Sequence, residues 1–426
     1  MSNPRISCAY TLQKILEEKV FFSEIKANIA ANDLPFVNMS VLTTLRRLNI
    51  IKAVLSSCLK KKIPHKHITA YYLLLNAIAE ILYMNTDDAL VINSTVANIK
   101  QTCDKFLGGM ANAVLRRISV QKEFFLQKYG NISPLPEEFQ NILSGYQPSE
   151  IDKISAVFTR KVPLDISVKS NPQFWAEKLG ASILPNGSLR LADSARIKEI
   201  AGYDDGQWWV QDCAAALAVN VLGNVGTKKV IDLCAAPGGK TAQLAAKGAK
   251  VTALDISANR LQKLQQNMYR LGFHNIQTLC ADALEYMQHS NETFDAVLLD
   301  APCSATGTLR RHPEVLYNKT LTDVKEQAEI QKKMLDLSRN LLKKGGILIY
   351  CVCSIAKAEG EEQIADFIKN NPDFKTLPID VKEISPYGEW SNNLITADGC
   401  IRTLPFYEEK NGGMDAFFIC RLQRII

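Results

Sequence analysis

Short apolar runs alternate with helical stretches along the chain after Thr227. The runs cover residues 230–233, 251–254, 296–299 and 347–352, and the helical stretches include residues 258–271 and 321–342. Runs of this length are typical of buried strands, and strands joined through helices form parallel sheets that are covered on both faces. The pattern therefore predicts a doubly wound α/β sheet, and we place its domain at residues 226–426.

The first part of the chain has a different pattern. Residues 5–128 carry apolar residues at helical spacing, with few glycines and no strand-like alternation, which predicts an all-helical domain over residues 1–130. Turn-rich sequence follows around residues 130–148. Residues 131–225 are interpreted as a linker and a small mixed α/β segment that binds RNA, with a strand at 164–168 and a helix at 172–179.

Positive charge is concentrated in the N-terminal third. Residues 1–130 hold 17 Lys plus Arg against 9 Asp plus Glu, a net +8, so the rest of the chain carries −2 of the total +6. The densest run consists of Lys60, Lys61, Lys62 and Lys66. Such a run favours phosphate contact but also occurs as an ordinary solvated surface, and both interpretations stay open here.

Several sequence features indicate a cytoplasmic protein. The eleven cysteines are scattered without a disulfide-like spacing, and residues 1–10 contain no apolar signal-peptide core. The most apolar helical stretch, residues 69–84, is shorter than a membrane span and contains Asn76 and Glu80, so we interpret it as a buried core helix.

A glycine-rich loop follows the first predicted strand. Its sequence, residues 232–241, is Asp-Leu-Cys-Ala-Ala-Pro-Gly-Gly-Lys-Thr. A Walker A loop requires glycine where Cys234 stands, and the loop lacks the Gly-x-Gly-x-x-Gly order of dinucleotide sites. A structural tight turn remains an alternative. Acidic residues end or follow the next strands, namely Asp255, Asp282 and Asp300. Together with Asp232 they predict a polar crevice suited to an adenosine-containing ligand.

Two strands also bring cysteines to the same edge. Cys303 follows the strand at 296–299, and Cys353 follows the strand at 347–352. Cys351 shares a face with Cys353 but lies inside its strand. Inert core packing and a metal site are the alternatives, and the metal site is disfavoured because none of the five histidines accompanies a cysteine motif.

Four segments carry a resemblance to a known family. Residues 232–241, the Asp-Ala-Pro-Cys-Ser of 300–304 and the Cys-Ser of 353–354 resemble the RNA cytosine-C5 methyltransferases of the RsmB/NOP/Sun family, and residues 209–212 match a further motif of that family. Residues 91–117 are similar to NusB. The sequence departs from the family in having Val352 instead of threonine before Cys353, and Ala416 instead of glycine.

The resemblance implies a Rossmann-like class I methyltransferase that uses S-adenosyl-L-methionine and no metal. It further implies that Cys353 is the nucleophile and that Cys303 assists product release. The residues expected to hold the cofactor are Cys234, Ala235, Ala236, Pro237, Gly238, Gly239, Lys240, Asp255, Asp282 and Asp300. The implied substrate is 16S ribosomal RNA, unassembled or early in small-subunit assembly, and the implied enzyme is a monomer.

The expected reaction explains why a cysteine is needed. Attack of a thiolate on C6 of cytosine makes C5 electron-rich enough to accept a methyl group. The base must leave its stack for this attack, which costs least in unpaired RNA. Methylation of another RNA or of DNA, and an RNA-binding assembly factor with a vestigial catalytic domain, are the alternative functions.

Overall fold

The computed structural model describes residues 3–103, 105–192 and 196–425, which fall into two compact units. Unit 1 comprises Met1–Ser144, Pro148–Thr159 and Leu309–Thr320. Unit 2 comprises Gly145–Gln147, Arg160–Thr308 and Leu321–Ile426. No helix of the described residues is long and apolar enough to cross a membrane.

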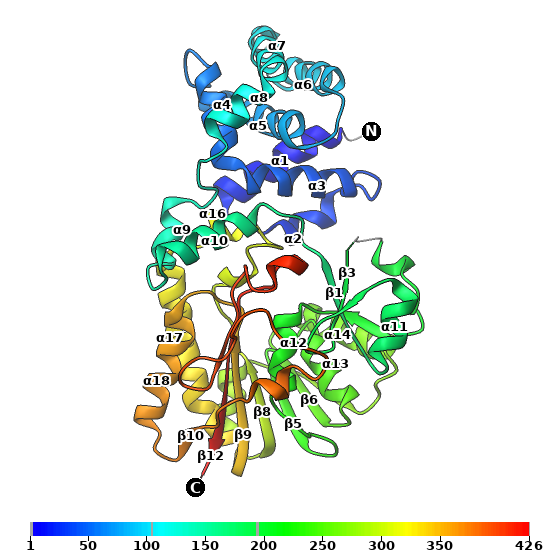
Figure 1. The fold of residues 1–426 in the computed structure, drawn as a ribbon, viewed down its shortest axis with the longest axis vertical. Coiled ribbons are helices and arrows are strands. Elements are labelled where there is room, and N and C mark those ends of the chain that lie inside the picture. The colour runs from blue at the N-terminus through cyan, green and yellow to red at the C-terminus, as the bar shows by residue number, and fades with distance from the viewer. Residues whose placement is uncertain (1–2, 104, 193–195, 426) are drawn as a thin grey trace. The chain divides into compact units, whose positions relative to one another are not determined.

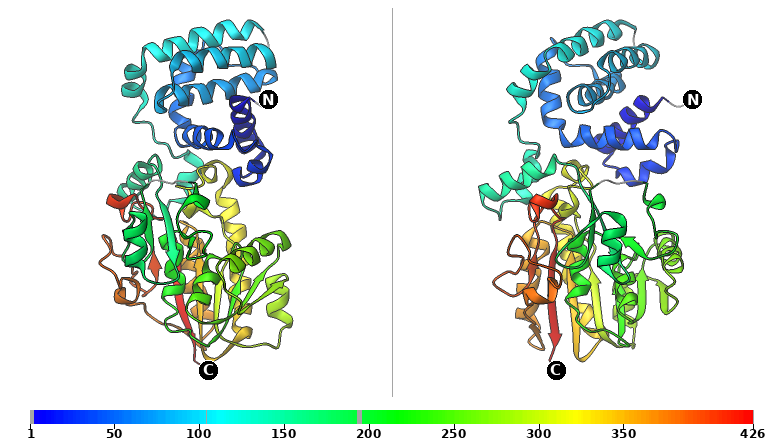
Figure 2. Two further views of the ribbon diagram at one scale, coloured as in Figure 1. Left: turned by 90° about the vertical axis from the view of Figure 1, so that its right-hand side faces the viewer. Right: turned by 45° about the vertical axis from the view of Figure 1, so that its right-hand side comes forward.

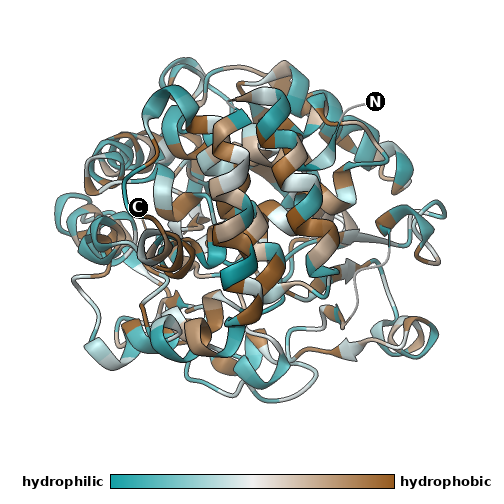
Figure 3. Cartoon of the chain, turned by 90° about the horizontal axis from the view of Figure 1, so that it is seen from above, coloured by the Kyte–Doolittle hydropathy of each residue, from teal (hydrophilic) through white to brown (hydrophobic). Residues whose placement is uncertain are grey.

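Unit 1 is built from helices, as predicted for the N-terminal region (Figure 2). They are α1 (Pro4–Glu18), α2 (Phe22–Ile25), α3 (Leu34–Arg46), α4 (Leu48–Cys58), α5 (Ile68–Tyr83), α6 (Asp88–Thr102), α7 (Lys105–Val120), α8 (Lys122–Tyr129), α9 (Glu137–Ile142), α10 (Pro148–Phe158) and α16 (Val315–Asn318). Hydrophobic and hydrophilic residues alternate along the helices in Figure 3, as expected of helices that bury one side.

Helix α5 is the central element of unit 1. It is buried along most of its length and packs against α1, α3, α4, α6 and α7. The one acidic residue on it, Glu80, is fully buried and forms an ion pair with Arg5 at 2.7 Å. This ion pair offsets the cost of burying a carboxylate, and the helix confirms the buried core helix predicted at residues 69–84.

A short segment from the second half of the sequence belongs to unit 1. In the segment 309–320, the Tyr317 hydroxyl donates to the Leu45 carbonyl at 2.7 Å, and the Asn318 amide donates to the Lys19 carbonyl at 3.0 Å. Arg46 in turn donates to the carbonyl of Arg310 at 2.8 Å. No sequence pattern predicted this packing, because it joins residues more than 260 positions apart.

The larger sheet of unit 2 contains the apolar runs. Its strands are β5 (Lys229–Leu233), β6 (Lys250–Asp255), β7 (Ile276–Cys280), β8 (Phe294–Asp300), β9 (Leu342–Val352), β10 (Phe374–Thr376), β11 (Ile401–Arg402) and β12 (Phe418–Arg424). The order is β10-β12-β9-β8-β5-β6-β7, with β11 paired to β12 (Figure 1). The strands from β9 to β7 are parallel, whereas β12 is antiparallel to β9.

Helices cover both faces of this sheet. They are α12 (Cys213–Asn220), α13 (Gly239–Ala246) and α14 (Ala258–Arg270) on one face, and α15 (Ala283–His289), α17 (Leu321–Ser338) and α18 (Glu361–Asn370) on the other. Along β8 the buried residues alternate between the two cores, since Leu298 belongs to one and Leu299 to the other. The doubly wound sheet is confirmed, and its order with one antiparallel strand is typical of class I methyltransferases.

A smaller antiparallel sheet precedes the larger one in unit 2. Its strands, β1 (Leu164–Val168), β2 (Ser182–Ile183), β3 (Leu189–Leu191) and β4 (Trp208–Val210), have the order β2-β3-β1-β4. Helix α11 (Pro172–Leu179) packs on this sheet through Trp175. The predicted strand at 164–168 and helix at 172–179 both form.

Two sequence expectations differ from the structure. The helix expected at residues 321–342 ends at Ser338, because residues 339–341 tighten into a single 3₁₀ turn and β9 begins at Leu342. The two units also do not follow the boundaries placed after residues 130 and 225, since α9 and α10 belong to unit 1 and the smaller sheet to unit 2. The RNA-binding role of residues 131–225 stays a prediction.

Candidate active site

The glycine-rich loop links the end of β5 to the start of α13. Gly238 has a φ of 103°, and a Cβ there would lie 2.8 Å from the Leu264 side chain of α14, so only glycine permits this approach. The Asp255 carboxylate at the end of β6 accepts hydrogen bonds from the backbone amides of Ala236 at 3.1 Å and Ser257 at 3.0 Å. The loop is thereby fixed against the neighbouring strand.

A cavity of about 370 Å³ opens at the carboxyl edge of the parallel strands. This volume is in the usual range for a small-molecule site. The predicted site residues that line the cavity are Cys234, Ala236, Asp255, Asp282, Asp300, Cys303 and Cys353. Ala235, Pro237, Gly238, Gly239 and Lys240 are not among its lining residues, although they form the loop beneath it.

Asp232 does not belong to the polar crevice, contrary to the sequence interpretation. It is fully buried one residue before the end of β5, and the Thr241 hydroxyl donates to its Oδ2 at 2.6 Å. Burial raises the pKa of Asp232 to about 7. Only three of the four acidic strand ends therefore face the cavity, because the side chain of Asp232 points into the sheet–helix interface.

Lys240 forms an ion pair with Asp300, the acidic residue that ends β8. Its ammonium donates to Asp300 Oδ2 at 2.7 Å and is almost fully buried. Burial alone would lower the pKa of Lys240, but the Asp300 carboxylate and the thiols of Cys351 and Cys353 raise it overall. The ammonium therefore stays charged, and the sulfurs of Cys351 and Cys353 lie within its electrostatic reach.

The two predicted cysteines meet at the cavity. Their Sγ atoms lie 3.3 Å apart, because Cys303 follows β8, Cys353 follows β9, and these strands are parallel neighbours. The hydrogen bond to Cys353, together with burial, holds the pKa of Cys303 well above its usual value. Cys303 therefore keeps its proton at neutral pH, whereas Cys353 lies beside the Lys240 charge.

Close backbone packing holds the two cysteine loops together. The Gly307 amide donates to the Cys353 carbonyl at 3.0 Å, and its carbonyl accepts from Ala416 at 2.9 Å. A Cβ on Gly307 would lie 2.0 Å from the Ala416 carbonyl oxygen, so the approach requires glycine at 307. Ala416 and Val352 are both buried, and neither lines the cavity.

The sequence interpretation missed two features of the site. Arg260 lines the cavity, lies 3.4 Å from Asp255 and donates to the carbonyl of Ala236. The buried carboxylate of Glu359 binds the serines that follow both cysteines. The repeated Cys-Ser pair was a signal for a shared partner, but no local pattern distinguishes Glu359 from the other acids near it.

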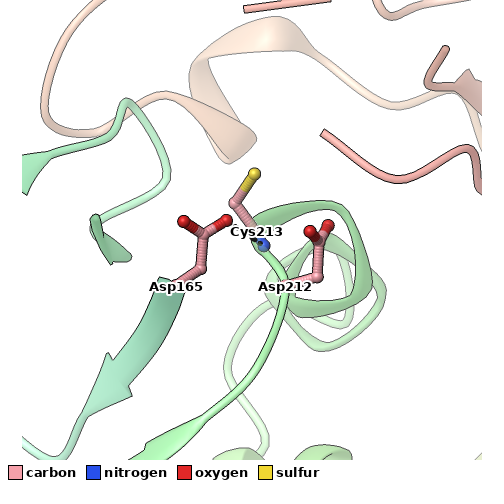
Figure 4. A group of neighbouring side chains, drawn as sticks. All are labelled: Asp165, Asp212 and Cys213. Carbon is pink, nitrogen blue, oxygen red and sulfur yellow. Dashed lines mark hydrogen bonds between the residues drawn. The ribbon is translucent and has the colours of Figure 1, made fainter. Parts of the chain in front are cut away.

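One group of described residues has the composition of a metal site. Asp165, Asp212 and Cys213 place their ligand atoms within 4.8 Å of one another (Figure 4). However, Arg190 donates to both oxygens of Asp165 at 2.7 Å, and Asp212 caps α12 through the Ala214 amide. The arginine already neutralises the central carboxylate, so this group is a structural ion pair and not a metal centre.

Comparison with known proteins gives two family matches. Residues 219–423 match the family of the 16S rRNA methyltransferase RsmB/F, and residues 2–120 match the NusB family. The ribosomal RNA small subunit methyltransferase B of Proteus mirabilis is 29% identical over 393 residues, which span 87% of this chain and 92% of the relative. The protein of the same name from Photorhabdus laumondii is 28% identical and covers 99% of both chains.

Solved structures share the fold. The crystal structure of PH0851 superposes with a TM-score of 0.75 at 22% identity and covers 99% of both chains. The structure of NSun6 from Pyrococcus horikoshii with SFG has a TM-score of 0.57 at 19% identity, covering 68% of this chain and 98% of that one. The similarity thus extends from the larger sheet to the helical region.

Proposed function

We propose that this chain, which joins a NusB-family domain to a methyltransferase domain of the RsmB/F family, methylates C5 of a cytosine in 16S ribosomal RNA. S-adenosyl-L-methionine is the methyl donor, and Cys353 forms a transient covalent bond to C6 of the base. The observation that carries the proposal is the pair of thiols 3.3 Å apart, both lining the cavity that Asp255 and Asp282 also line.

The cavity fits the cofactor in size and in donor set. Asp255 and Asp282 each use part of their carboxylate to accept backbone amides, and each retains lone pairs for hydroxyl groups of a ribose. The exposed side chain of Ile256 and the side chain of Leu284 supply apolar contact on the same lining. When bound, S-adenosyl-L-methionine supplies an electrophilic methyl group on its sulfonium.

Cys353 starts the proposed reaction. Its thiolate forms a bond to C6, and the electrons of the C5–C6 double bond move to C5, which then accepts the methyl group. Attack on C6 requires the thiolate form of Cys353, because the thiol is a much weaker nucleophile. No metal takes part in this scheme.

Cys303 completes the proposed cycle. After C5 has lost its proton to a base, the double bond re-forms and the bond from C6 to Cys353 breaks. The Sγ of Cys303 lies 3.3 Å from the leaving sulfur of Cys353, which is within reach for a role in release. This accounts for the release role assigned to Cys303.

RNA recognition is assigned to the basic surface of unit 1. Lys60, Lys61, Lys62 and Lys66 are all exposed, in the loop and 3₁₀ turn between α4 and α5. Lysines on an exposed loop can contact RNA phosphates, and such contacts do not depend on the base sequence. The proposed substrate is RNA that is unassembled or early in assembly, where the target base is unpaired, and the proposed setting is the bacterial cytoplasm, with the enzyme acting as a monomer.

Methyl transfer to defined RNA tests the proposal. Purified protein is incubated with tritium-labelled S-adenosyl-L-methionine and a 16S ribosomal RNA transcript, and the digested nucleosides are separated. Label in 5-methylcytidine, placed at one position by bisulfite sequencing, is the expected result. Label in another nucleoside, or transfer to DNA alone, overturns the substrate, and the absence of transfer to any nucleic acid favours an assembly factor.

A further inference from the structure

The residues that follow the two active-site cysteines share one partner. The Ser304 amide donates to Glu359 Oε1 at 2.8 Å, and the hydroxyls of Ser304 and Ser354 both donate to Glu359 Oε2. Because each serine is covalently adjacent to a cysteine, a single carboxylate is joined to both cysteine loops.

Additional hydrogen bonds fix the carboxylate and its backbone. Gln331 Nε2 donates to Glu359 Oε1 and to the Pro302 carbonyl, both at 2.9 Å, so it also holds the residue before Cys303. The Tyr350 hydroxyl donates to the Glu359 carbonyl at 2.6 Å. Glu359 lies in the turn 357–359 just before α18, and β9 and α17 supply these two partners.

Burial of the Glu359 carboxylate carries a free-energy cost of desolvation, which the surrounding groups must offset. The side chain is fully buried, and within the described part of the chain no Lys, Arg or His side chain forms a salt bridge with it. Arg402 is close by, where it donates to the Ser354 carbonyl at 2.6 Å, but its ion pair is with Glu361. A buried carboxylate stabilised by hydrogen bonds alone is rarely retained for stability, since apolar packing would be less costly.

We propose that Glu359 is a positioning residue that sets the separation and orientation of the Cys303 and Cys353 thiols by holding Ser304 and Ser354. This inference rests on the proposed function for its catalytic consequence, while the alignment itself is independent of any substrate. The carboxylate acts through the serines and is not among the residues that line the cavity.

The charge of Glu359 has a second effect in the same direction. The hydrogen bond to Cys353, burial, the charge of Cys353 and, after these, the Glu359 carboxylate raise the pKa of Cys303. The negative charge of Glu359 therefore favours the protonated form of Cys303.

The Glu359→Gln variant tests the inference, because glutamine keeps the shape but replaces one acceptor oxygen by a donor group. We expect cofactor affinity within about twofold of wild type, an unchanged KM for 16S transcript and a kcat lowered about 100-fold, as for a misplacement near 1 Å. Glu408→Gln is the matched control, because Glu408 is a buried carboxylate of unit 2 that accepts the Ser391 amide at 2.7 Å and the Asn411 amide at 3.0 Å.

A reaction without RNA reports the alignment directly. Diamide accepts two electrons and two protons from two thiols and becomes the hydrazine, while a bond forms between the two sulfurs. We expect rapid formation of the Cys303–Cys353 disulfide in wild type and Glu408→Gln, at least about tenfold slower formation in Glu359→Gln, and none in Cys303→Ala, as determined by peptide mass mapping.

If Glu359→Gln does not fold, a second variant tests the same inference. The double variant Ser304→Ala/Ser354→Ala retains the carboxylate and the Ser304 amide bond, and it should reproduce the slow disulfide formation. Wild-type kcat and wild-type disulfide rates in either variant overturn the inference. If wild-type protein forms the disulfide rapidly but makes no 5-methylcytidine, the proposed function is wrong. The disulfide rates of wild type and variants still test whether Glu359 aligns the two thiols.

Discussion

The Sγ atom of Cys303 lies 3.3 Å from the Sγ atom of Cys353, although 50 residues separate them in the chain. The thiols differ in their surroundings, since Cys303 is held in its protonated form and Cys353 lies beside the Lys240 ammonium. Equivalent thiols would be interchangeable in function. Because the surroundings of the two thiols differ, we expect their roles to be separable by mutation.

Cys353→Ala should abolish methyl transfer while cofactor binding is kept. The thiolate is needed to activate C5, but the cavity retains Asp255, Asp282 and the glycine-rich loop. Tritium transfer to 16S transcript and calorimetric binding of S-adenosyl-L-methionine measure the two properties. Residual transfer above about one thousandth of wild type would contradict the assignment of the nucleophile.

Cys303→Ala should form the covalent bond, accept the methyl group and then stall. A protein–RNA species that survives denaturing electrophoresis is expected to accumulate, and it should be absent from the Cys303→Ala/Cys353→Ala double variant. If Cys303 were only a packing residue, the gel would show no adduct. An adduct in Cys353→Ala instead would mean that the roles are reversed.

Asp255→Ala should weaken cofactor binding. The expected loss of hydrogen bonds from a ribose to a charged acceptor amounts to about 1.5 to 3 kcal/mol, or about 10- to 150-fold in Kd. Because Asp255 also accepts the Ala236 and Ser257 amides, Asp255→Asn is measured in parallel as the variant that disturbs the loop less. An unchanged Kd in both variants would refute the role.

Removal of the lysine run should lower RNA affinity and its salt dependence together. For Lys60→Ala/Lys61→Ala/Lys62→Ala, the slope of log K against log salt should fall by about 0.7 for each lost contact to single-stranded RNA. The control replaces three exposed lysines of unit 2, Lys250, Lys344 and Lys369. Equal slopes in wild type and the first variant would indicate that the run is only a solvated surface.

Asp232→Asn should flatten part of the pH dependence of stability. The pKa of Asp232 is raised by burial from 3.8 to about 7, so between these values the folded protein holds a proton that the unfolded chain has lost. Wild-type free energy of unfolding therefore falls with pH in this window, by up to about 1.4 kcal/mol per pH unit relative to the variant. Urea unfolding at pH 4.5, 5.5 and 6.5 measures the difference, and parallel profiles would contradict it.

Local sequence patterns determined most of the fold. Apolar runs between helical stretches predicted β5, β6, β8 and β9, because a buried strand must be apolar along its length. The same patterns placed Cys303 and Cys353 at one edge, since carboxyl ends of parallel strands meet there. The resemblance to a family then supplied the roles, which neither spacing nor composition contains.

Tertiary packing decided the remaining features of the site. Four features depend on contacts between segments that are separate in the chain. They are the 3.3 Å distance between the thiols, the burial of Asp232, the hydrogen bonds of Glu359 to both serines, and the inclusion of residues 309–320 in unit 1. Such relationships depend on strand register and on which side chains fill the interior, and a pattern read along one segment does not contain that information. The sequence alone determined that Cys303, Cys353 and three of the acidic strand ends meet at the sheet edge, whereas only the folded chain determined their distances, the burial of Asp232 and the position of Arg260.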